Sequence, residues 1–170
     1  MAEVDGTTVR DATGADVDDV LRFGERVVQP HYVPLIGAAA AASQHDTWWS
    51  AEHIGSAVDD GTLVVAEADR TVVGVAQRGR YEGEHVIYKL YVDPALRGRG
   101  LGPRLVDALE QQLPAGVERV WIEHFAANER AAAFYDREGF LVQRVDAGPT
   151  GDPALAVVWR ARDRRREETA

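Results

Sequence analysis

The stretch Leu90-Tyr91-Val92-Asp93-Pro94, followed by Arg97-Gly98-Arg99-Gly100-Leu101-Gly102, decides the fold of this chain. β-branched and aromatic residues from Val86 to Val92 predict a strand, and Asp93-Pro94 closes it. Beyond the glycines, leucine and valine recur at helical spacing from Leu105 to Leu113. The sequence therefore predicts a strand, a glycine loop and a helix in direct succession.

The glycine loop has the composition of a phosphate cradle. Its glycines allow backbone amides to turn inward, and the N-terminus of the following helix adds positive potential. The expected donors are the amides of Gly98 through Gly102 and the side chain of Arg104. A dinucleotide fingerprint requires a glycine where this chain has Pro103, and a nucleotide-triphosphate loop requires Gly-Lys-Ser/Thr, so both alternatives fail. A plain glycine turn with solvated arginines is the remaining alternative.

Two motifs link this chain to a known family. The spacing Arg97-x-x-Gly100-x-Gly102 resembles Gln/Arg-x-x-Gly-x-Gly/Ala, the pyrophosphate motif of the GNAT superfamily of N-acetyltransferases. The segment Asn128 to Phe140 resembles the second motif of that family, Asn-x-x-Ala-x-x-Phe-Tyr-x-x-x-Gly-Phe, and Val9 to Asp16 is similar to its usual first strand and helix. The resemblance implies an α/β fold with a mixed (α+β) sheet. That central sheet is expected to be twisted and mostly antiparallel, with about seven strands flanked by about four helices.

The resemblance also implies acetyl-coenzyme A (acetyl-CoA) as the co-substrate, and no metal. In the family the glycine loop holds the pyrophosphate. The strand before it offers backbone groups to the pantetheine arm and to the thioester carbonyl, where such donors stabilise an oxyanion. The residues that the resemblance assigns to cofactor binding are Leu90, Tyr91, Val92, Arg97, Gly98, Arg99, Gly100, Leu101, Gly102, Arg104, Asn128 and Tyr135.

Tyr135 is the residue that the resemblance assigns to the leaving thiolate, which its hydroxyl protonates. Asn128 and Tyr135 are seven residues apart. Two helical turns, about 10 Å, therefore separate them on one face, where both can line one extended ligand. Asn128 also suits the N-cap of this helix. The alternative for Tyr135 is a half-buried tyrosine that packs on the sheet.

Direct attack on a thioester needs a deprotonated amine, so an alkyl ammonium with a pKa of about 10 requires a base or a water path to one. The candidates are Glu84, on the strand before the loop, and Glu123 and His124, at the end of the next strand. Glu123 and His124 point to opposite faces, so only one of them can face the cleft. Lys89 is the sole lysine, and we expect it at the surface of the sheet rather than in catalysis.

The segment between the first two helices shapes the acceptor pocket in this superfamily, and here it is aromatic. Its ring-bearing residues are His31, Tyr32, Trp48, Trp49 and His53. Aromatic walls suit an apolar or cationic amine. Trp48 lies on an apolar helical stripe and is expected in the core, whereas Trp49 and His53 form an i,i+4 pair expected to face the cleft or solvent.

Local signals predict the other elements. The pairs Thr13–Asp16 and Ser43–Asp46 resemble capping boxes at the starts of two helices, and Pro30 and Pro34 are expected to interrupt the first of them. A polar turn separates two apolar runs that predict a hairpin. The two hairpin strands are predicted at Leu63 to Ala66 and Val72 to Ala76. A further strand is predicted at Val117 to His124 and a late helix at Asn128 to Glu138. The last two strands are predicted at Phe140 to Val145 and Ala154 to Trp159.

The composition is that of an ordinary globular protein, with 170 residues of which 45% are hydrophobic and 28% charged. This length predicts one domain, residues 1–160, followed by a charged and disordered tail, residues 161–170. No run approaches the roughly 18 apolar residues that span a membrane, and no export signal is visible. Zero cysteines exclude disulfides, thiolate zinc sites and a cysteine nucleophile, and a cytoplasmic location fits best.

The net charge of −9 disfavours a nucleic-acid partner, whose binding needs many phosphate-neutralising cations. The sequence therefore predicts an enzyme that transfers an acetyl group from acetyl-CoA to a primary amine by direct attack in a ternary complex. The amine belongs to a small molecule or a peptide. A non-catalytic acyl-CoA-binding or sensing module with the same fold is the alternative. The chain is expected to be a monomer or a homodimer.

Overall fold

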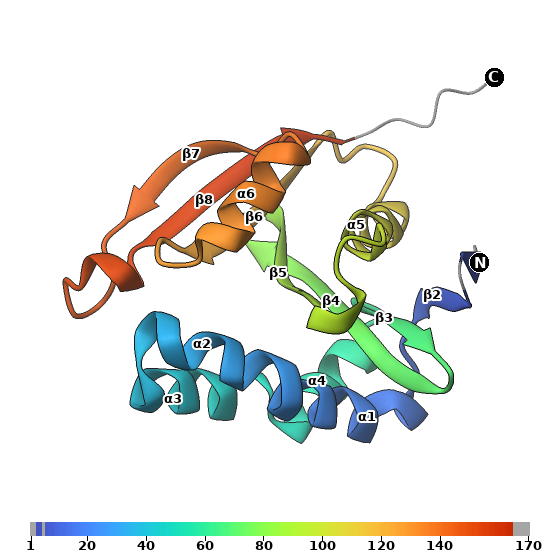
Figure 1. Ribbon diagram of the computed structural model, residues 1–170. Coiled ribbons are helices and arrows are strands. Elements are labelled where there is room, and N and C mark those ends of the chain that lie inside the picture. The colour runs from blue at the N-terminus through green and yellow to red at the C-terminus, as the bar shows by residue number, and fades with distance from the viewer. Residues whose placement is uncertain (1–2, 5, 165–170) are drawn as a thin grey trace. The chain divides into compact units, whose positions relative to one another are not determined.

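The computed structural model describes residues 3–4 and 6–164, and Figure 1 shows the course of the chain. The described residues fall into two compact units. Unit 1 comprises residues up to 78 and residues 88–112, and unit 2 comprises residues 79–87 and those from 113 onward. Strand β5 (Glu84–Val92) belongs with its first half to unit 2 and with its second half to unit 1. One domain over residues 1–160 stays a prediction.

Unit 1 is built on strands in the hydrogen-bonded order β1-β2-β3-β4-β5, and the pairs from β1 to β4 are antiparallel. Its other strands are β1 (Glu3–Val4), β2 (Thr7–Asp11), β3 (Leu63–Ala68) and β4 (Thr71–Tyr81), the last of which ends in unit 2. The predicted hairpin of β3 and β4 is confirmed. Its turn residues Asp69 and Arg70 have φ angles of 48° and 62°, the left-handed region that tight hairpin turns require.

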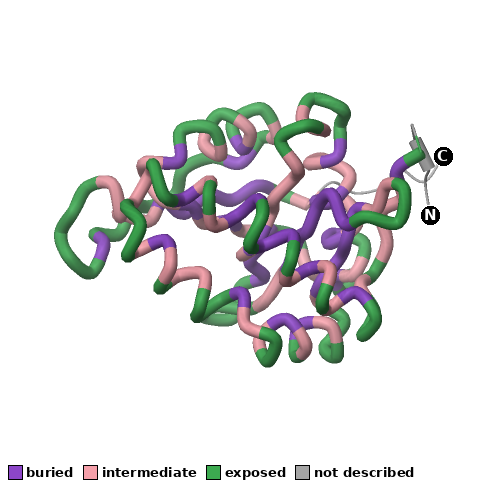
Figure 2. Tube along the Cα trace, turned by 60° about the horizontal axis from the view of Figure 1, so that its bottom comes forward, coloured by how far each residue is buried: buried purple, intermediate pink, exposed green. Residues whose placement is uncertain are grey.

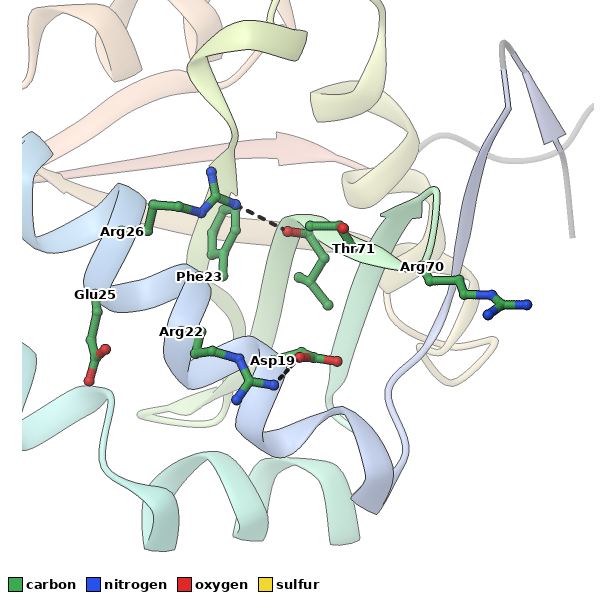
Figure 3. A pocket seen from close by; sticks show the side chains of 8 residues that line it. Asp19, Arg22, Phe23, Glu25, Arg26, Arg70 and Thr71 are labelled. Atoms are coloured by element: carbon green, nitrogen blue, oxygen red, sulfur yellow. Dashed lines mark hydrogen bonds and ion pairs between the residues drawn. The ribbon is translucent and has the colours of Figure 1, made fainter.

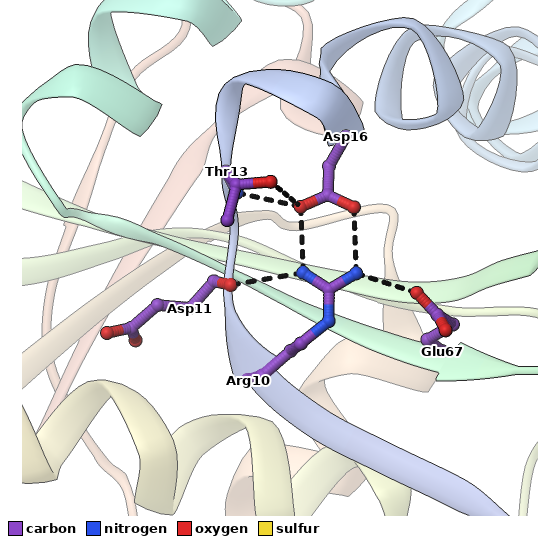
Figure 4. A network of polar contacts seen from close by, with 5 residues as sticks. All are labelled: Arg10, Asp11, Thr13, Asp16 and Glu67. Atoms are coloured by element: carbon purple, nitrogen blue, oxygen red, sulfur yellow. Dashed lines mark hydrogen bonds and ion pairs between the residues drawn. The ribbon is translucent and has the colours of Figure 1, made fainter. Parts of the chain in front are cut away.

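The helices of unit 1 are α1 (Val17–Phe23), α2 (Gln29–Ile36), α3 (Ala38–Trp48), α4 (Ala51–Asp59) and α5 (Leu101–Gln111). The predicted capping box before α1 is confirmed, since the Thr13 N–H donates to the Asp16 carboxylate at 2.7 Å. Asp16 also accepts two hydrogen bonds from Arg10, at 2.7 and 2.8 Å, and Arg10 reaches Glu67 at 2.6 Å (Figure 4). This network ties β2 and β3 to the start of α1.

The two prolines of α2 do not interrupt the first helix, which corrects one prediction. Helix α1 continues through a π-helical turn, η2 (Gly24–Val28), directly into α2, which contains Pro30 and Pro34. Pro30 lies in the first turn of α2, directly after the π-helical turn, and Pro34 lies inside α2. The chain breaks instead at Gly37, whose φ of 88° lies in the region that favours glycine.

Ser43 and Asp46 do not cap a helix, which corrects a second prediction. Helix α3 begins well before them and includes both. The next helix, α4, starts after the N-cap Ser50, whose hydroxyl accepts a hydrogen bond from the His53 N–H at 3.1 Å. A capping-box pattern inside a continuous helix has no orphan amides to satisfy, so the pattern alone does not fix a helix start.

The core of unit 1 is formed by apolar residues of its strands and helices. Figure 2 colours the chain by the burial of each residue. Phe23 of α1 and Ile54 of α4 are almost fully buried. Helix α5 buries Leu101, Leu105 and Leu109 on one face, which is the helical spacing that the sequence predicted. This packing fixes α5, and with it the end of the glycine loop.

Unit 2 holds strands in the order β5-β6-β8-β7. Its elements beyond β5 are β6 (Arg119–Phe125), α6 (Glu129–Arg137), β7 (Leu141–Asp146), the short 3-10 turn η4 (Pro153–Leu155) and β8 (Val157–Asp163). Strand β5 pairs with β6 in parallel, with Val86 opposite Trp121, and the other two pairs are antiparallel. Gly139, with φ of 82°, follows α6 as predicted.

The end of the described chain differs from the prediction. Strand β8 starts after η4, later than predicted, and runs to Asp163, so that the predicted tail of residues 161–170 begins inside a strand. Arg162, which the predicted tail includes, is 7% exposed, and Arg160 just before it is 5% exposed. Both donate to backbone carbonyls at or just after the end of α6, and each also forms an ion pair, Arg160 with Asp136 and Arg162 with Glu138. Residues 165–170 lie outside the described residues.

The predicted mixed fold is confirmed. The described residues contain eight strands, one of them only two residues long, and six α-helices. Antiparallel pairing predominates, with the parallel pair β5–β6 as the exception among the registers. Among these same residues, no helix is both long and apolar enough to cross a membrane.

Candidate functional site

The glycine loop of unit 1 has the backbone geometry of an anion cradle. Gly98 and Gly100 have φ angles of 76° and 75°, and Gly100 is the N-cap of α5. Within the described residues, the N–H groups from Gly98 to Gly102 donate to no backbone carbonyl. They are therefore available to an anion at the positive end of a helix. Pro103 is the third residue of α5, within the first turn, whose N–H groups have no helical partner.

The start of the loop is anchored by Asp93. Its N–H donates to the Val73 carbonyl at 2.8 Å, and its carboxylate accepts from the Ala95 N–H at 3.0 Å. Arg26 forms an ion pair with the same carboxylate and, as the largest cause, lowers the pKa of Asp93. The predicted donor Arg104 sends one guanidinium nitrogen to the Thr7 carbonyl at 2.9 Å, so part of its donor capacity is used within unit 1.

A pocket of about 600 Å³ lies beside α1, between Phe23, Arg26 and the β3–β4 turn (Figure 3). Its other lining residues are Asp19, Arg22, Glu25, Arg70, Thr71 and Val72. None of the predicted site residues lines it. Two of its arginines already pair with carboxylates, Arg22 with Asp19 and Arg26 with Asp93. We therefore do not assign the cofactor or the acceptor to this pocket.

Strand β5 presents an aromatic and basic cluster on one face. The Tyr91 hydroxyl lies 2.8 Å from the Tyr32 hydroxyl, and the Tyr91 ring meets that of Trp49 edge-on at 5.7 Å. Lys89, two residues earlier and on the same face, lies under the Trp49 ring with Nζ 5.5 Å from its centroid. Lys89 is only 4% exposed, so the prediction of a surface position is wrong.

The burial of Trp48 and Trp49 is the reverse of the prediction. Trp48 is 51% exposed and Trp49 is 5% exposed. Trp48 ends α3, so its side chain does not continue the apolar stripe of α4 that the spacing suggested. Trp49 lies against the π-helical turn, where a Cβ on Gly24 would be 2.5 Å from its ring. The absent side chain at Gly24 is what lets this indole reach β5.

In unit 2, Asn128 and Tyr135 lie on α6 as the motif requires. The Asn128 side chain accepts from the Ala131 N–H at 3.2 Å, which confirms the predicted N-cap. Both residues are 6% exposed. The Tyr135 ring stacks on His124 at 5.8 Å with an interplanar angle of 22°, and its edge meets Phe134 and Phe140. Rings on several sides hold the tyrosine in one orientation.

His124 is engaged at both ring nitrogens. Its Nδ1 lies 2.9 Å from the Phe125 carbonyl, and its Nε2 accepts from the Arg160 Nε–H at 3.0 Å. This pairing fixes a neutral ring with the proton on Nδ1, and burial lowers the pKa of His124. His124 therefore has no free lone pair, and the structure does not support it as a base. Its ring stacks on that of Tyr135, which makes it a candidate for positioning the tyrosine.

The two glutamate candidates differ in burial. Glu84, at the start of β5, is exposed. Glu123 is half-buried on β6, on the opposite face from His124, and burial raises the pKa of its carboxyl. Of the three base candidates, only Glu123 combines partial burial with a carboxylate to which the described residues offer no hydrogen bond. Among the described residues, no group of three His, Asp or Glu side chains is placed to hold a metal ion.

Comparison with known proteins matches a region that includes the glycine loop and α6. The model of the acetyltransferase (GNAT) family matches residues 30–140. The chain is 37% identical over 95 residues to the mycothiol acetyltransferase of Propionibacterium freudenreichii, a match that covers 52% of this chain and 30% of that protein. It is 38% identical over 58 residues to the [ribosomal protein bS18]-alanine N-acetyltransferase of Haemophilus ducreyi, covering 34% and 40%. The chain thus matches less than half the length of these relatives.

Among solved structures, the chain is similar to the PaiA N-acetyltransferase of Thermoplasma acidophilum in complex with coenzyme A. The TM-score is 0.75 with 15% identity, and the match covers 92% of this chain and 98% of that one. At this identity the likeness concerns the fold.

Proposed function

This chain belongs to the GNAT acetyltransferase family, and from that premise we propose that it transfers an acetyl group from acetyl-CoA to a primary amine. The observation that carries the proposal is the pair of left-handed glycines, Gly98 and Gly100, that opens α5 with free amides. Their Cβ positions are open, so the loop leaves room for a ligand. The proposal includes every residue that the family resemblance assigns to cofactor binding. In it, the backbone amides of the glycine loop bind the pyrophosphate.

The chemistry that we propose is direct transfer without a covalent enzyme intermediate. The amides of Leu90 to Val92 hold the pantetheine arm and the thioester carbonyl, and stabilise the negative charge that develops on its oxygen. Tyr135 gives its hydroxyl proton to the departing thiolate. Burial and ring contacts support this role, because they fix the tyrosine before the reaction. Asn128 contacts the pantetheine arm and caps α6.

Binding of acetyl-CoA is tested by thermal unfolding. At 100 times its dissociation constant, a ligand stabilises the folded state by about 2.7 kcal/mol. For a domain of this size the melting temperature should rise by roughly 5 to 10 °C. A rise with ATP or NAD and none with acetyl-CoA would contradict the assignment.

Catalysis is tested by the release of free thiol from acetyl-CoA in the presence of a panel of amines. Tyr135→Phe should lower kcat by about 10²- to 10⁴-fold, the usual contribution of a general acid. Tyr81→Phe is the matched control, because Tyr81 is 44% exposed and stacks on Trp159 instead. Wild-type binding of acetyl-CoA without thiol release for any amine would favour the alternative, a non-catalytic acyl-CoA-binding module.

The acceptor class is a primary amine of a small molecule or a peptide. The two relatives are named for mycothiol and for an alanine of a ribosomal protein, so both kinds of acceptor belong in the panel. We further propose a cytoplasmic protein without a nucleic-acid partner, acting as a monomer or a homodimer. The lack of cysteines and the net charge of −9 support this, and light scattering together with cell fractionation tests it.

A further inference from the structure

The sole lysine of the chain is buried without an acidic partner. Lys89 donates to the Gln77 side-chain oxygen at 2.6 Å, inside unit 1. Among the residues that the structure describes, no carboxylate lies within ion-pair distance of its nitrogen. A buried ammonium without an anion is costly, so such a lysine is rare unless it serves a purpose.

The groups around Lys89 are polar or aromatic but not acidic. Gln77 comes from β4, Trp49 from the end of α3 and His53 from α4. Burial, followed by the charge of Lys89, lowers the pKa of His53. One amide oxygen and one indole face are thus the features that stabilise a charged Lys89. Neither carries a negative charge, so no ion pair offsets the cost of burying the Lys89 ammonium.

We propose that Lys89 is the catalytic base, which takes the proton from the ammonium of the acceptor. The inference rests on the proposed acetyl transfer and names a residue for its missing step. Lys89 directly precedes the strand segment proposed for the thioester, Leu90 to Val92. It also lies under Trp49, which belongs to the aromatic segment expected to line the acceptor pocket.

The proton balance of the step is complete. Neutral Lys89 accepts one proton from the acceptor ammonium, whose nitrogen then attacks the thioester carbon. The amide nitrogen loses a second proton as the carbon–sulfur bond breaks, and this proton replaces the one that Tyr135 gives to the thiolate. The Lys89 ammonium finally releases its proton to solvent. The net products are an amide, a free thiol and one proton.

Burial supports this role because it lowers the pKa of Lys89 to about 7. A base whose pKa lies near the working pH is present in its neutral form and still accepts a proton readily. Unperturbed lysine, with a pKa of about 10.4, is almost fully charged at neutral pH and cannot act in this way.

The first test is a direct titration of Lys89. Because no other lysine exists in the chain, selective ¹³C labelling of lysine gives a single side-chain signal from this chain. We expect its midpoint near pH 7, and a midpoint near pH 10 would overturn the proposal. Acetylation of Lys89 itself, seen by mass spectrometry after turnover, would also overturn it, since the lysine would then be a nucleophile.

The second test separates a base from a structural lysine. Lys89→Met and Lys89→Arg should both lose the acidic limb of the pH profile of kcat/KM and about 10²- to 10⁴-fold in rate. An acceptor whose amino group is already deprotonated at the assay pH should recover most of that loss in rate. Glu52→Gln, an exposed change on α4 next to His53, is the control that keeps the limb.

Two outcomes keep this proposal distinct from the proposed function. Retention of the acetyl-CoA melting shift in both Lys89 variants shows that they are folded. If the wild type transfers acetyl groups while the Lys89 variants keep the acidic limb and Glu123→Gln loses it, Lys89 is not the base and the transferase assignment stands. If the wild type releases no thiol with any amine, the proposed function itself fails.

Discussion

Arg160→Met is the perturbation that examines how the chain positions Tyr135. Arg160 donates to His124 at 3.0 Å and to the Phe140 carbonyl at 3.1 Å, and it pairs with Asp136. The Asp136 side chain is 66% exposed, so this ion pair contributes little. The other two contacts are buried, and leaving their acceptors unsatisfied costs about 1 to 3 kcal/mol each. For two contacts we expect a loss of about 2 to 6 kcal/mol in unfolding free energy, with little added cavity cost because methionine fills most of the freed volume.

The same substitution should affect catalysis more than stability alone explains. Without Arg160, the ring of His124 loses its anchor, and Tyr135 loses a fixed stacking partner. A shift of the tyrosine by a fraction of an ångström should lower kcat by about 10- to 100-fold. The KM for acetyl-CoA should change little, because the glycine loop does not involve Arg160.

Arg162→Met is the matched control on the same strand. Arg162 donates to the Glu138 carbonyl at 2.7 Å and covers the Phe140 ring at 4.5 Å, so its loss also destabilises unit 2. The two variants are compared by urea unfolding and by kcat at a temperature where both are folded. Equal loss of kcat in both variants, or a wild-type kcat in Arg160→Met, would refute the positioning role of His124.

Three further changes test the fold and the loop. Arg10 is the main cause that lowers the pKa of Asp16 from 3.8 to about 2, so Asp16 stabilises the protein above pH 3.8 and this is lost as the pH falls toward 2. Asp16→Asn should therefore remove about 1 to 2 kcal/mol at pH 6 and flatten the decline of stability in acid, measured by urea unfolding at several pH values. Gly24→Ala should cost about 1 to 3 kcal/mol, visible as a lower melting temperature, because the added Cβ would overlap Trp49. Gly100→Ala should cost about 1 to 2 kcal/mol, because its φ is 75°, and should raise the KM for acetyl-CoA.

Gly55→Ala is the control for both glycine changes. Gly55 lies inside α4, and a Cβ there meets nothing within 4 Å. It should stabilise the protein by up to about 1 kcal/mol. Wild-type stability in Gly24→Ala would contradict the close approach of Trp49, and a pH dependence of unfolding that is unchanged in Asp16→Asn would contradict the Arg10 network.

The elements closest to the candidate site were predictable because their signals are local. The strand before the glycine loop, the loop with its helix, and α6 with its asparagine cap follow from motifs a few residues long. The hairpin of β3 and β4 follows in the same way from two apolar runs. Each of these segments carries its own start, stop or turn residues, so no knowledge of distant contacts is needed.

The predictions of burial were wrong where contacts between residues far apart in the sequence determine which side chains are covered. Lys89 is the sole lysine on a strand, and nothing near it in the sequence shows that Trp49 and Gln77 cover it. Arg160 and Arg162 look like part of a charged tail, yet carbonyls at the end of α6 hold them inside the unit. The boundary between α3 and α4 reverses which tryptophan is buried; its local signal, the N-cap Ser50, competes with the Ser43–Asp46 pattern that lies inside α3.

The most direct test of the central claim is thiol release from acetyl-CoA by the wild type and by Tyr135→Phe, across an amine panel that includes small molecules and a peptide N-terminus. We predict turnover with at least one primary amine, and a fall of about 10²- to 10⁴-fold in kcat for Tyr135→Phe with an unchanged acetyl-CoA melting shift. Equal turnover by the two proteins would contradict the assignment of Tyr135, and no turnover with any amine would contradict the acetyl transfer itself.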